Sequence, residues 1–196
     1  MAATLDPAQM IFIDECGSHI AMTPLYARAP KGERAIGKVP RNYGKNTTLI
    51  ASLSLSGMGE ALILEGSADA RAFELYIEQI LAPDLQSGQI VIMDNLSVHL
   101  GKRVQECIEA RGCRLLFLPP YSPDFSPIEK AFSKLKTALR RLGARTQDAL
   151  WEALGQVLTT ITAQDALGWF AHCGYSSTLE PELPFIETQQ FEAQAF

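Results

Sequence analysis

Three acidic residues of this chain occupy positions from which they could act together on a substrate. Asp14 follows the apolar run Met10–Ile13, and Asp94 follows the apolar run Ile90–Met93. Glu129 lies in the first turn of a predicted helix, with 34 residues between it and Asp94. Carboxylates held close together repel one another unless cations lie between them, and Mg²⁺ prefers carboxylate oxygens and water as ligands. These residues therefore predict a divalent-metal site suited to chemistry on phosphates.

The segment between Asp94 and Glu129 predicts how the acids are brought together. Its length accommodates a crossover helix at about 101–110 and a strand at 114–118 that returns parallel to a strand at 89–93. An apolar run of four residues that stops on an acid is typical of a buried strand ending at a sheet edge. We therefore expect the first two acids to be neighbours at one edge, with the third added by the next helix.

The chain before this segment predicts an antiparallel meander and then a helix. We expect strands at 20–26, 47–55 and 61–64. Between the first two of these strands, prolines and glycines break any helix and predict an exposed basic loop. Ser67 or Asp69 caps a helix whose apolar residues recur at helical spacing as far as Leu81, and Pro83 is expected to end it.

The most clearly predicted helix begins after Ser126, which suits the N-cap, with Pro127 at the first helical position. Apolar residues at spacings of four and three continue from Ile128 to Leu142 and predict one buried face. Glu129 stands three residues after the N-cap, so a capping box is the alternative role for its side chain. Asp14 and Asp94 have an alternative as well, because aspartate is common in turns at strand ends. Two further amphipathic helices are expected at 147–161 and 166–170.

Basic residues gather in two parts of the chain, although the net charge is −5. Six lie between Arg28 and Lys45, six lie between Lys130 and Arg145, and none follows Arg145. The total charge argues against a nucleic-acid partner, but this distribution allows a polyanion to bind locally. The expected DNA contacts are Arg41, Lys45, Lys130, Lys134 and Arg140.

Length and composition indicate one globular domain. The chain has 196 residues, of which 47% are hydrophobic and 20% charged. No apolar run approaches the roughly 20 residues that span a bilayer, and no signal peptide is evident, so we expect a cytoplasmic protein that does not enter membranes. The four cysteines show no C-x-x-C pair, which predicts free and largely buried thiols.

Three segments resemble the carboxylate motifs of the DDE transposases of the mariner and bacterial insertion-sequence superfamily: IFIDECG, IVIMDNLSVHL and LPPYSPDFSPIEKAFSKLK. The resemblance covers about residues 10–142, and it calls for the 34-residue separation of the second and third acids. It implies an α/β, ribonuclease-H-like fold with a five-stranded mixed sheet, its second strand antiparallel, flanked by helices. It also implies that Asp14, Asp94 and Glu129 are the catalytic triad that binds Mg²⁺ or Mn²⁺, with two ions expected. Asn95 and His99 would lie beside these ligands.

The resemblance implies a polynucleotidyl transferase that cleaves DNA at transposon ends and joins the freed ends to target DNA, as a homodimer in a synaptic complex. Residues 1–175 would form the catalytic domain, with a core at about 10–142 and C-terminal helices at 147–172, before a loosely ordered acidic tail at 176–196. A DNA-recognising helix-turn-helix part would be separately encoded or fused by frameshift. The alternatives are a DNA-binding remnant that regulates an intact transposase and a ribonuclease-H-like nuclease without strand transfer.

Overall fold

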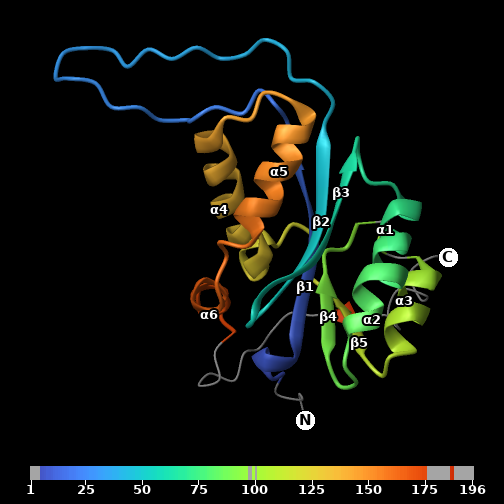
Figure 1. The fold of residues 1–196 in the computed structure, drawn as a ribbon. Coiled ribbons are helices and arrows are strands. Elements are labelled where there is room, and N and C mark those ends of the chain that lie inside the picture. The colour runs from blue at the N-terminus through green and yellow to red at the C-terminus, as the bar shows by residue number, and fades with distance from the viewer. Residues whose placement is uncertain (1–4, 97–98, 100, 176–185, 188–196) are drawn as a thin grey trace.

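A mixed β-sheet runs through the middle of the protein, whose computed structural model describes residues 5–96, 99, 101–175 and 186–187 (Figure 1). The strands are β1 (Met10–Ser18), β2 (Thr47–Ser54), β3 (Gly57–Glu65), β4 (Ile90–Met93), β5 (Arg114–Phe117) and β6 (Ile186–Glu187). Their order is β3-β2-β1-β4-β5-β6. Strand β2 is antiparallel to β1 and β3, whereas β1, β4 and β5 are parallel. The predicted five-stranded sheet with an antiparallel second strand is therefore confirmed, and β6 adds a short sixth strand antiparallel to β5.

Helices cover both faces of the sheet (Figure 1). One layer contains α4 (Pro127–Leu142), α5 (Gln147–Leu158) and α6 (Ala163–His172). The other contains α1 (Ala70–Tyr76), the π-helical turn Ile77–Leu81, α2 (Ala82–Asp84) and α3 (Lys102–Glu109). Successive residues of a strand point to opposite faces. Met10, Phe12 and Cys16 of β1 accordingly pack into the core under α4–α6, while Ile11 and Ile13 pack into the core under α1–α3.

Helix α4 forms where the apolar spacing predicted it. Ile128, Phe132, Leu135 and Leu139 are all buried against the sheet, whereas Leu142 at the helix end is exposed. Gly143 ends the helix in the left-handed conformation, with φ 63° and its N–H donating to Leu139 O. Ser126 is the N-cap as predicted, but the alternative of a capping box is not found, because the Ser126 side chain makes no cap hydrogen bond. Glu129 is thus not engaged in capping its own helix.

The predicted strand at 20–26 is wrong, because residues 19–46 form an irregular arm that projects from the domain (Figure 1, blue to cyan). Strand β1 runs on to Ser18 and pairs directly with β2, so no strand edge is left for an intervening strand. The base of the arm is fixed by Arg145, whose Nη1 donates to Ile20 O at 2.9 Å and Met22 O at 3.0 Å. The prediction of an exposed basic loop is confirmed.

The helix predicted to end at Pro83 continues through it. Asp69 is the N-cap and accepts from Ala72 N at 2.8 Å, as one of the two expected caps. The backbone then widens into the π-helical turn, in which Ala82 N donates to Ile77 O five residues back. Pro83 has no N–H to donate, and this widened turn accommodates it within the first turn of α2.

The remaining predictions concern helix bounds, thiols and the chain end. Helix α6 begins three residues earlier than expected, since Thr162 and Asp165 form a capping box. All four cysteines are free, and Cys16, Cys113 and Cys173 are buried. In the described part of the chain, no helix combines the length and apolar character needed to cross a bilayer. Apart from β6, the predicted acidic tail lies outside the described residues.

Candidate active site

The register of the parallel strands aligns the first two acids. Met10, Ile11 and Phe12 of β1 pair with Ile90, Val91 and Ile92 of β4. Asp14 and Asp94 each stand two residues after the last of these pairs, Phe12 with Ile92. Strand β4 ends at Met93, as the apolar run predicted, but β1 continues past Asp14 to Ser18. The backbone of Asp14 is therefore fixed by strand pairing, whereas Asp94 lies beyond the end of its strand and is positioned by contacts with neighbouring residues.

Glu129 is brought to the same place by the segment that follows β5, the strand next to β4. Leu118 N, just after β5, donates to Met93 O at 2.9 Å, which keeps the two chain segments together beyond the strand ends. The segment 119–126 then turns through two prolines and a short 3-10 turn, Pro123–Phe125, into the first turn of α4. All three acids line one pocket of about 330 Å³. Tyr121, at the rim of this pocket, is fully exposed and has φ 58°.

Asp14 has the most perturbed carboxyl group of the three. Burial raises its pKa, the Glu15 N–H that donates to its Oδ1 at 2.7 Å lowers it, and the negative charges of Glu129, Asp94 and Glu15 raise it again. The net effect is a pKa of about 7 instead of the ordinary 3.8. A cation between the carboxylates would remove the repulsion and return Asp14 to its ionised form.

The donor types in the pocket fit a hard divalent cation. Three carboxylates line it, together with Asn95, whose side-chain oxygen is buried without a hydrogen-bond partner in the described residues. Carboxylate and amide oxygens suit Mg²⁺ and Mn²⁺. Among residues that the structure describes, however, no three His, Cys, Asp or Glu side chains are already gathered closely enough to hold a metal ion. The donor chemistry thus fits the ion, while the spacing is wider than one coordination shell.

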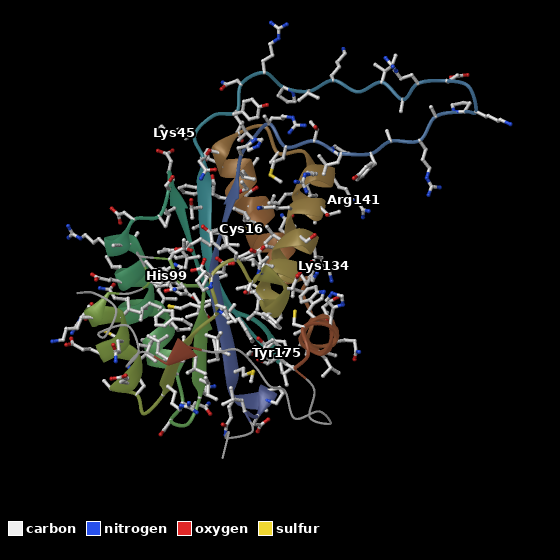
Figure 2. All side chains as sticks on the ribbon, turned by 180° about the vertical axis from the view of Figure 1, so that it is seen from behind. Cys16, Lys45, His99, Lys134, Arg141 and Tyr175 are labelled. Carbon is white, nitrogen blue, oxygen red and sulfur yellow. The ribbon has the colours of Figure 1, made fainter. Side chains whose placement is uncertain are left out.

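His99 lies on the side of the sheet that α1–α3 cover (Figure 2). Its ring contacts two acidic side chains. The ring is completely buried and stacks on Phe73, with 4.2 Å between ring centroids. Its Nδ1 lies 2.5 Å from Asp94 Oδ1, and its Nε2 lies 3.1 Å from both carboxylate oxygens of Glu15. Burial lowers the pKa of His99, but the hydrogen bonds to Asp94 and Glu15 outweigh burial and raise the pKa to about 10. Each ring nitrogen of His99 thus has a carboxylate partner that favours the protonated ring. The structure thus places both residues expected beside the acids, Asn95 and His99, at this site.

Lys136 is a neighbour of the site that the sequence reasoning missed. Burial raises the pKa of the Cys16 thiol to about 11, and the nearby Lys136 ammonium opposes that rise, whereas the charges of Asp14 and Glu129 add to it. Cys16 and Lys136 therefore lie on the same face as the two acids. The signal was present in the sequence, because Lys136 follows Glu129 by seven residues, which is about two helical turns.

The residues expected to contact DNA are distributed over three places. Arg41 and Lys45 belong to the arm, where Lys45 forms an ion pair with Glu65 at 2.5 Å. Lys130 and Lys134 line a groove formed by α4, α5 and α6. Lys134, which is labelled in Figure 2, is paired with Asp165 there at 2.6 Å. Arg140 lies on the side of the arm, since burial and then the charge of Arg140 lower the pKa of His19. The basic residues of α4 thus lie on two different faces of the helix, with Lys130 and Lys134 on one and Arg140 on the other.

Comparison with known proteins supplies a family and a fold. The family model described as "DDE superfamily endonuclease" matches residues 9–151. A search of curated proteins finds no match. Among solved structures, the chain is similar to the Mos1 strand transfer complex, with a TM-score of 0.64, 18% identity, and coverage of 85% of this chain and 51% of that chain. It is also similar to the Mos1 mariner paired end complex with Mn, with a TM-score of 0.60, 17% identity, and coverage of 85% and 53%.

A third similar structure is the catalytic core domain of BIV integrase, with a TM-score of 0.52 and 15% identity. The alignment covers 86% of this chain and 99% of that one. These likenesses bear out the ribonuclease-H-like fold that the sequence predicted. The chain spans about half the length of the Mos1 chains that it matches.

Proposed function

We propose that this chain, which belongs to the DDE superfamily endonucleases, is a transposase catalytic domain that cleaves DNA at transposon ends and transfers the freed ends into target DNA. The observation that carries the proposal is the convergence of Asp14, Asp94 and Glu129 on one pocket from three different elements. A catalytic site for phosphodiesters needs such convergent oxygen ligands at a fixed edge of the fold. The Mos1 strand transfer complex supports the joining step by analogy.

Asp14, Asp94 and Glu129 are the residues that would hold divalent ions, Mg²⁺ or Mn²⁺. Bound ions would supply an activated attacking oxygen and charge compensation at the leaving oxygen. In cleavage, a water oxygen bonds to phosphorus, the bond from phosphorus to the 3′ oxygen breaks, and that oxygen takes up a proton. In strand transfer, the new 3′-hydroxyl loses its proton as its oxygen bonds to a target phosphorus. The bond from that phosphorus to the target's own 3′ oxygen breaks, and that oxygen takes up a proton. The Mos1 complex with Mn supports the choice of cation.

The surroundings of the acids support their separate roles. Asp14 is fixed by the β1–β2 pairing, in which it stands opposite Ala51. Glu129 is exposed and is positioned by a helix whose buried face is anchored in the core. Asn95 offers an additional acceptor from its buried side-chain oxygen. These residues thus bind the ions and orient the phosphodiester, which enters from the open side of the pocket.

DNA is the proposed partner, held by the basic residues of the arm and of α4. A homodimer in a synaptic complex and a helix-turn-helix part supplied by frameshift or by a separate reading frame belong to the same proposal. The Mos1 structures are strand transfer and paired end complexes, which supports a multimer assembled on DNA. The division into a domain at 1–175 and a tail stays a prediction.

The test compares Asp94→Asn with Asp124→Asn in nicking of supercoiled plasmid by the purified chain with Mn²⁺. Asp124 is an exposed acid in the turn after Pro123, so its substitution controls for the loss of one negative charge nearby. We expect Asp94→Asn to lower the nicking rate by more than roughly 100-fold, because losing a residue that only supports a metal ligand already costs about 10–100-fold. The circular dichroism spectrum should be unchanged. Unchanged nicking by Asp94→Asn would refute the assignment.

A second measurement separates transposition from simple nuclease activity. Pre-cleaved DNA ends carrying the sequences that flank the gene are incubated with the protein, Mn²⁺ and a target plasmid. Joined products support the transposase. Nicking without joining would instead identify a ribonuclease-H-like nuclease, and the absence of both reactions would indicate a DNA-binding remnant.

A further inference from the structure

The buried His99 ring joins two acidic side chains, Glu15 in β1 and Asp94 just after the end of β4. The Glu15–His99 bridge consists of the Glu15 carboxylate, the His99 ring and the contact from His99 Nδ1 to Asp94 Oδ1. The ring has no exposed surface. A buried charged group is costly unless it is paired and hydrogen-bonded, and here both ring nitrogens have carboxylate partners.

Glu15 is excluded from the ligand set by the geometry of β1. Asp14 and Glu15 are adjacent in the strand, so their side chains point to opposite faces of the sheet. The face of Asp14 is the one that also carries Cys16 and packs toward α4, whereas the face of Glu15 carries Ile13 and packs toward α1–α3. Glu15 therefore meets His99, whose ring stacks on Phe73, on the far side of the sheet from Glu129. Its partner is the histidine.

Asp94 is the acid that needs external support. Asp14 is held by strand pairing and Glu129 by a helix, but residues 94–96 have no regular structure. Both hydrogen bonds to the Asp94 carboxylate in the described residues use Oδ1: His99 Nδ1 lies at 2.5 Å, and Leu96 N donates at 3.3 Å. The second oxygen, Oδ2, is left for another partner. A neighbouring residue that hydrogen-bonds one oxygen of a metal-binding carboxylate orients the carboxylate and leaves its other oxygen free for the metal. Asp94 shows this arrangement.

The histidine is itself held from several sides. Its ring stacks on Phe73 of α1, and its backbone N–H donates to Leu96 O at 2.9 Å. The Glu15 carboxylate receives both of its contacts from Nε2, which fixes the remaining rotation of the ring. A side chain locked in this way transmits its position to the group that it binds, so a change at Glu15 reaches Asp94 through the ring.

We propose that Glu15 and His99 are positioning residues that fix the carboxylate of Asp94 for metal binding. The proposal rests on the proposed function, in that Asp94 is taken as a metal ligand. Neither Glu15 nor His99 touches the ion or the DNA. The consequence is that removing the Glu15 carboxylate weakens metal binding at a site to which Glu15 contributes no ligand.

The test measures Mn²⁺ binding by isothermal titration calorimetry, a readout that needs no DNA and no turnover. Glu15→Leu should raise the dissociation constant for Mn²⁺ by about 10–100-fold, the usual cost of losing an outer partner of a ligand. Glu15→Gln keeps an oxygen that can accept from His99 and should restore most of the affinity. Glu74→Gln is the matched control, because Glu74 lies in α1 of the same layer and no hydrogen bond or ion pair joins it to the bridge among the described residues. The Mn²⁺ affinity of this variant should equal that of the parent chain.

A double-mutant cycle shows whether Glu15 acts through Asp94. When Asp94 is already replaced by Asn, the further change Glu15→Leu should cause no additional loss of Mn²⁺ affinity, because the carboxylate to be positioned is gone. Equal losses in both backgrounds would overturn the proposal, as would parent-like binding by Glu15→Leu. If Glu15→Leu fails to fold, the comparison of Glu15→Gln with His99→Gln in the same cycle replaces it. Failure of the parent chain to bind Mn²⁺ at all would instead count against the proposed function.

Discussion

Replacing Asp14 with asparagine should make the metal-free protein more stable at neutral pH. On folding, the pKa of Asp14 rises from 3.8 to about 7, chiefly through burial and then through the neighbouring carboxylates. The folded state therefore binds a proton more tightly than the unfolded state does. Stability falls as pH rises through this window, and the full cost of the ionised carboxylate is present above pH 7. Asparagine is neutral and of similar size, so it avoids that cost.

The size of the effect follows from the two pKa values. With these pKa values, the ionised Asp14 carboxylate lowers the free energy of unfolding by about 4 kcal/mol at pH 8 and by about 2 kcal/mol at pH 5. This cost vanishes below about pH 4. Such a difference is a large part of the 5–15 kcal/mol that stabilises a typical domain. The site of the proposed chemistry would thus be a local weakness of the fold until a cation is bound.

Urea unfolding followed by circular dichroism in EDTA measures this difference. The parent chain and Asp14→Asn are compared at pH 8 and pH 5, so that other titrating groups cancel between the two proteins. We expect the variant to be more stable at both values and the advantage to be larger at pH 8. Saturating Mg²⁺ should stabilise the parent chain and have less effect on the variant. An advantage that does not depend on pH, or a less stable variant at pH 8, would refute the reasoning.

Four further predictions concern the α4–α6 layer. Leu135→Ala removes a fully buried side chain and should lower the free energy of unfolding by about 2–5 kcal/mol in urea titrations. Gly143→Ala should cost about 1–2 kcal/mol, since φ is 63° there, whereas Gly155→Ala, in the interior of α5 with open space around its Cβ position, should raise melting temperature instead. The hydrogen bond from Lys134 is the main cause that lowers the pKa of Asp165 to about 2, so this carboxyl stabilises the fold above about pH 4 and loses that contribution as pH falls toward 2. In Lys134→Met, an NMR titration should find the Asp165 pKa closer to its ordinary value; an unchanged value would contradict the assigned cause.

The strands and the long helix could be predicted because their signals are local. The apolar run Ile90–Met93 is buried on both faces and ends on an acid, and α4 combines Pro127 at its start with a regular apolar seam. The distance from Asp94 to Glu129 then restricted what could lie between them. These features depend on residues close together in the chain, which is why sequence alone identified the three acids that line the pocket.

The parts that could not be predicted depend on distant partners. Strand β1 continues past Asp14 because β2, which is separated from it by 28 residues, pairs with it as far as Ser18. The apolar run itself stops at Ile13, so sequence alone predicts the end of the strand there and does not place Glu15 on the face opposite Asp14. Its contact with His99 spans 84 residues, and no local pattern signals it.

The arm at 19–46 also affects the order in which the strands of the sheet pair during folding. Strands β2 and β3 are joined by two residues, whereas β1 and β2 are separated by 28. Closing the longer connection costs roughly 2 kcal/mol more chain entropy on the logarithmic scaling of loop closure. Neighbouring strands with a short connection form on a microsecond timescale, so the β2–β3 hairpin is expected to precede the docking of β1. Asp14 would then reach its place beside Asp94 late in folding, and shortening the arm should speed up that step in stopped-flow refolding without moving the acids.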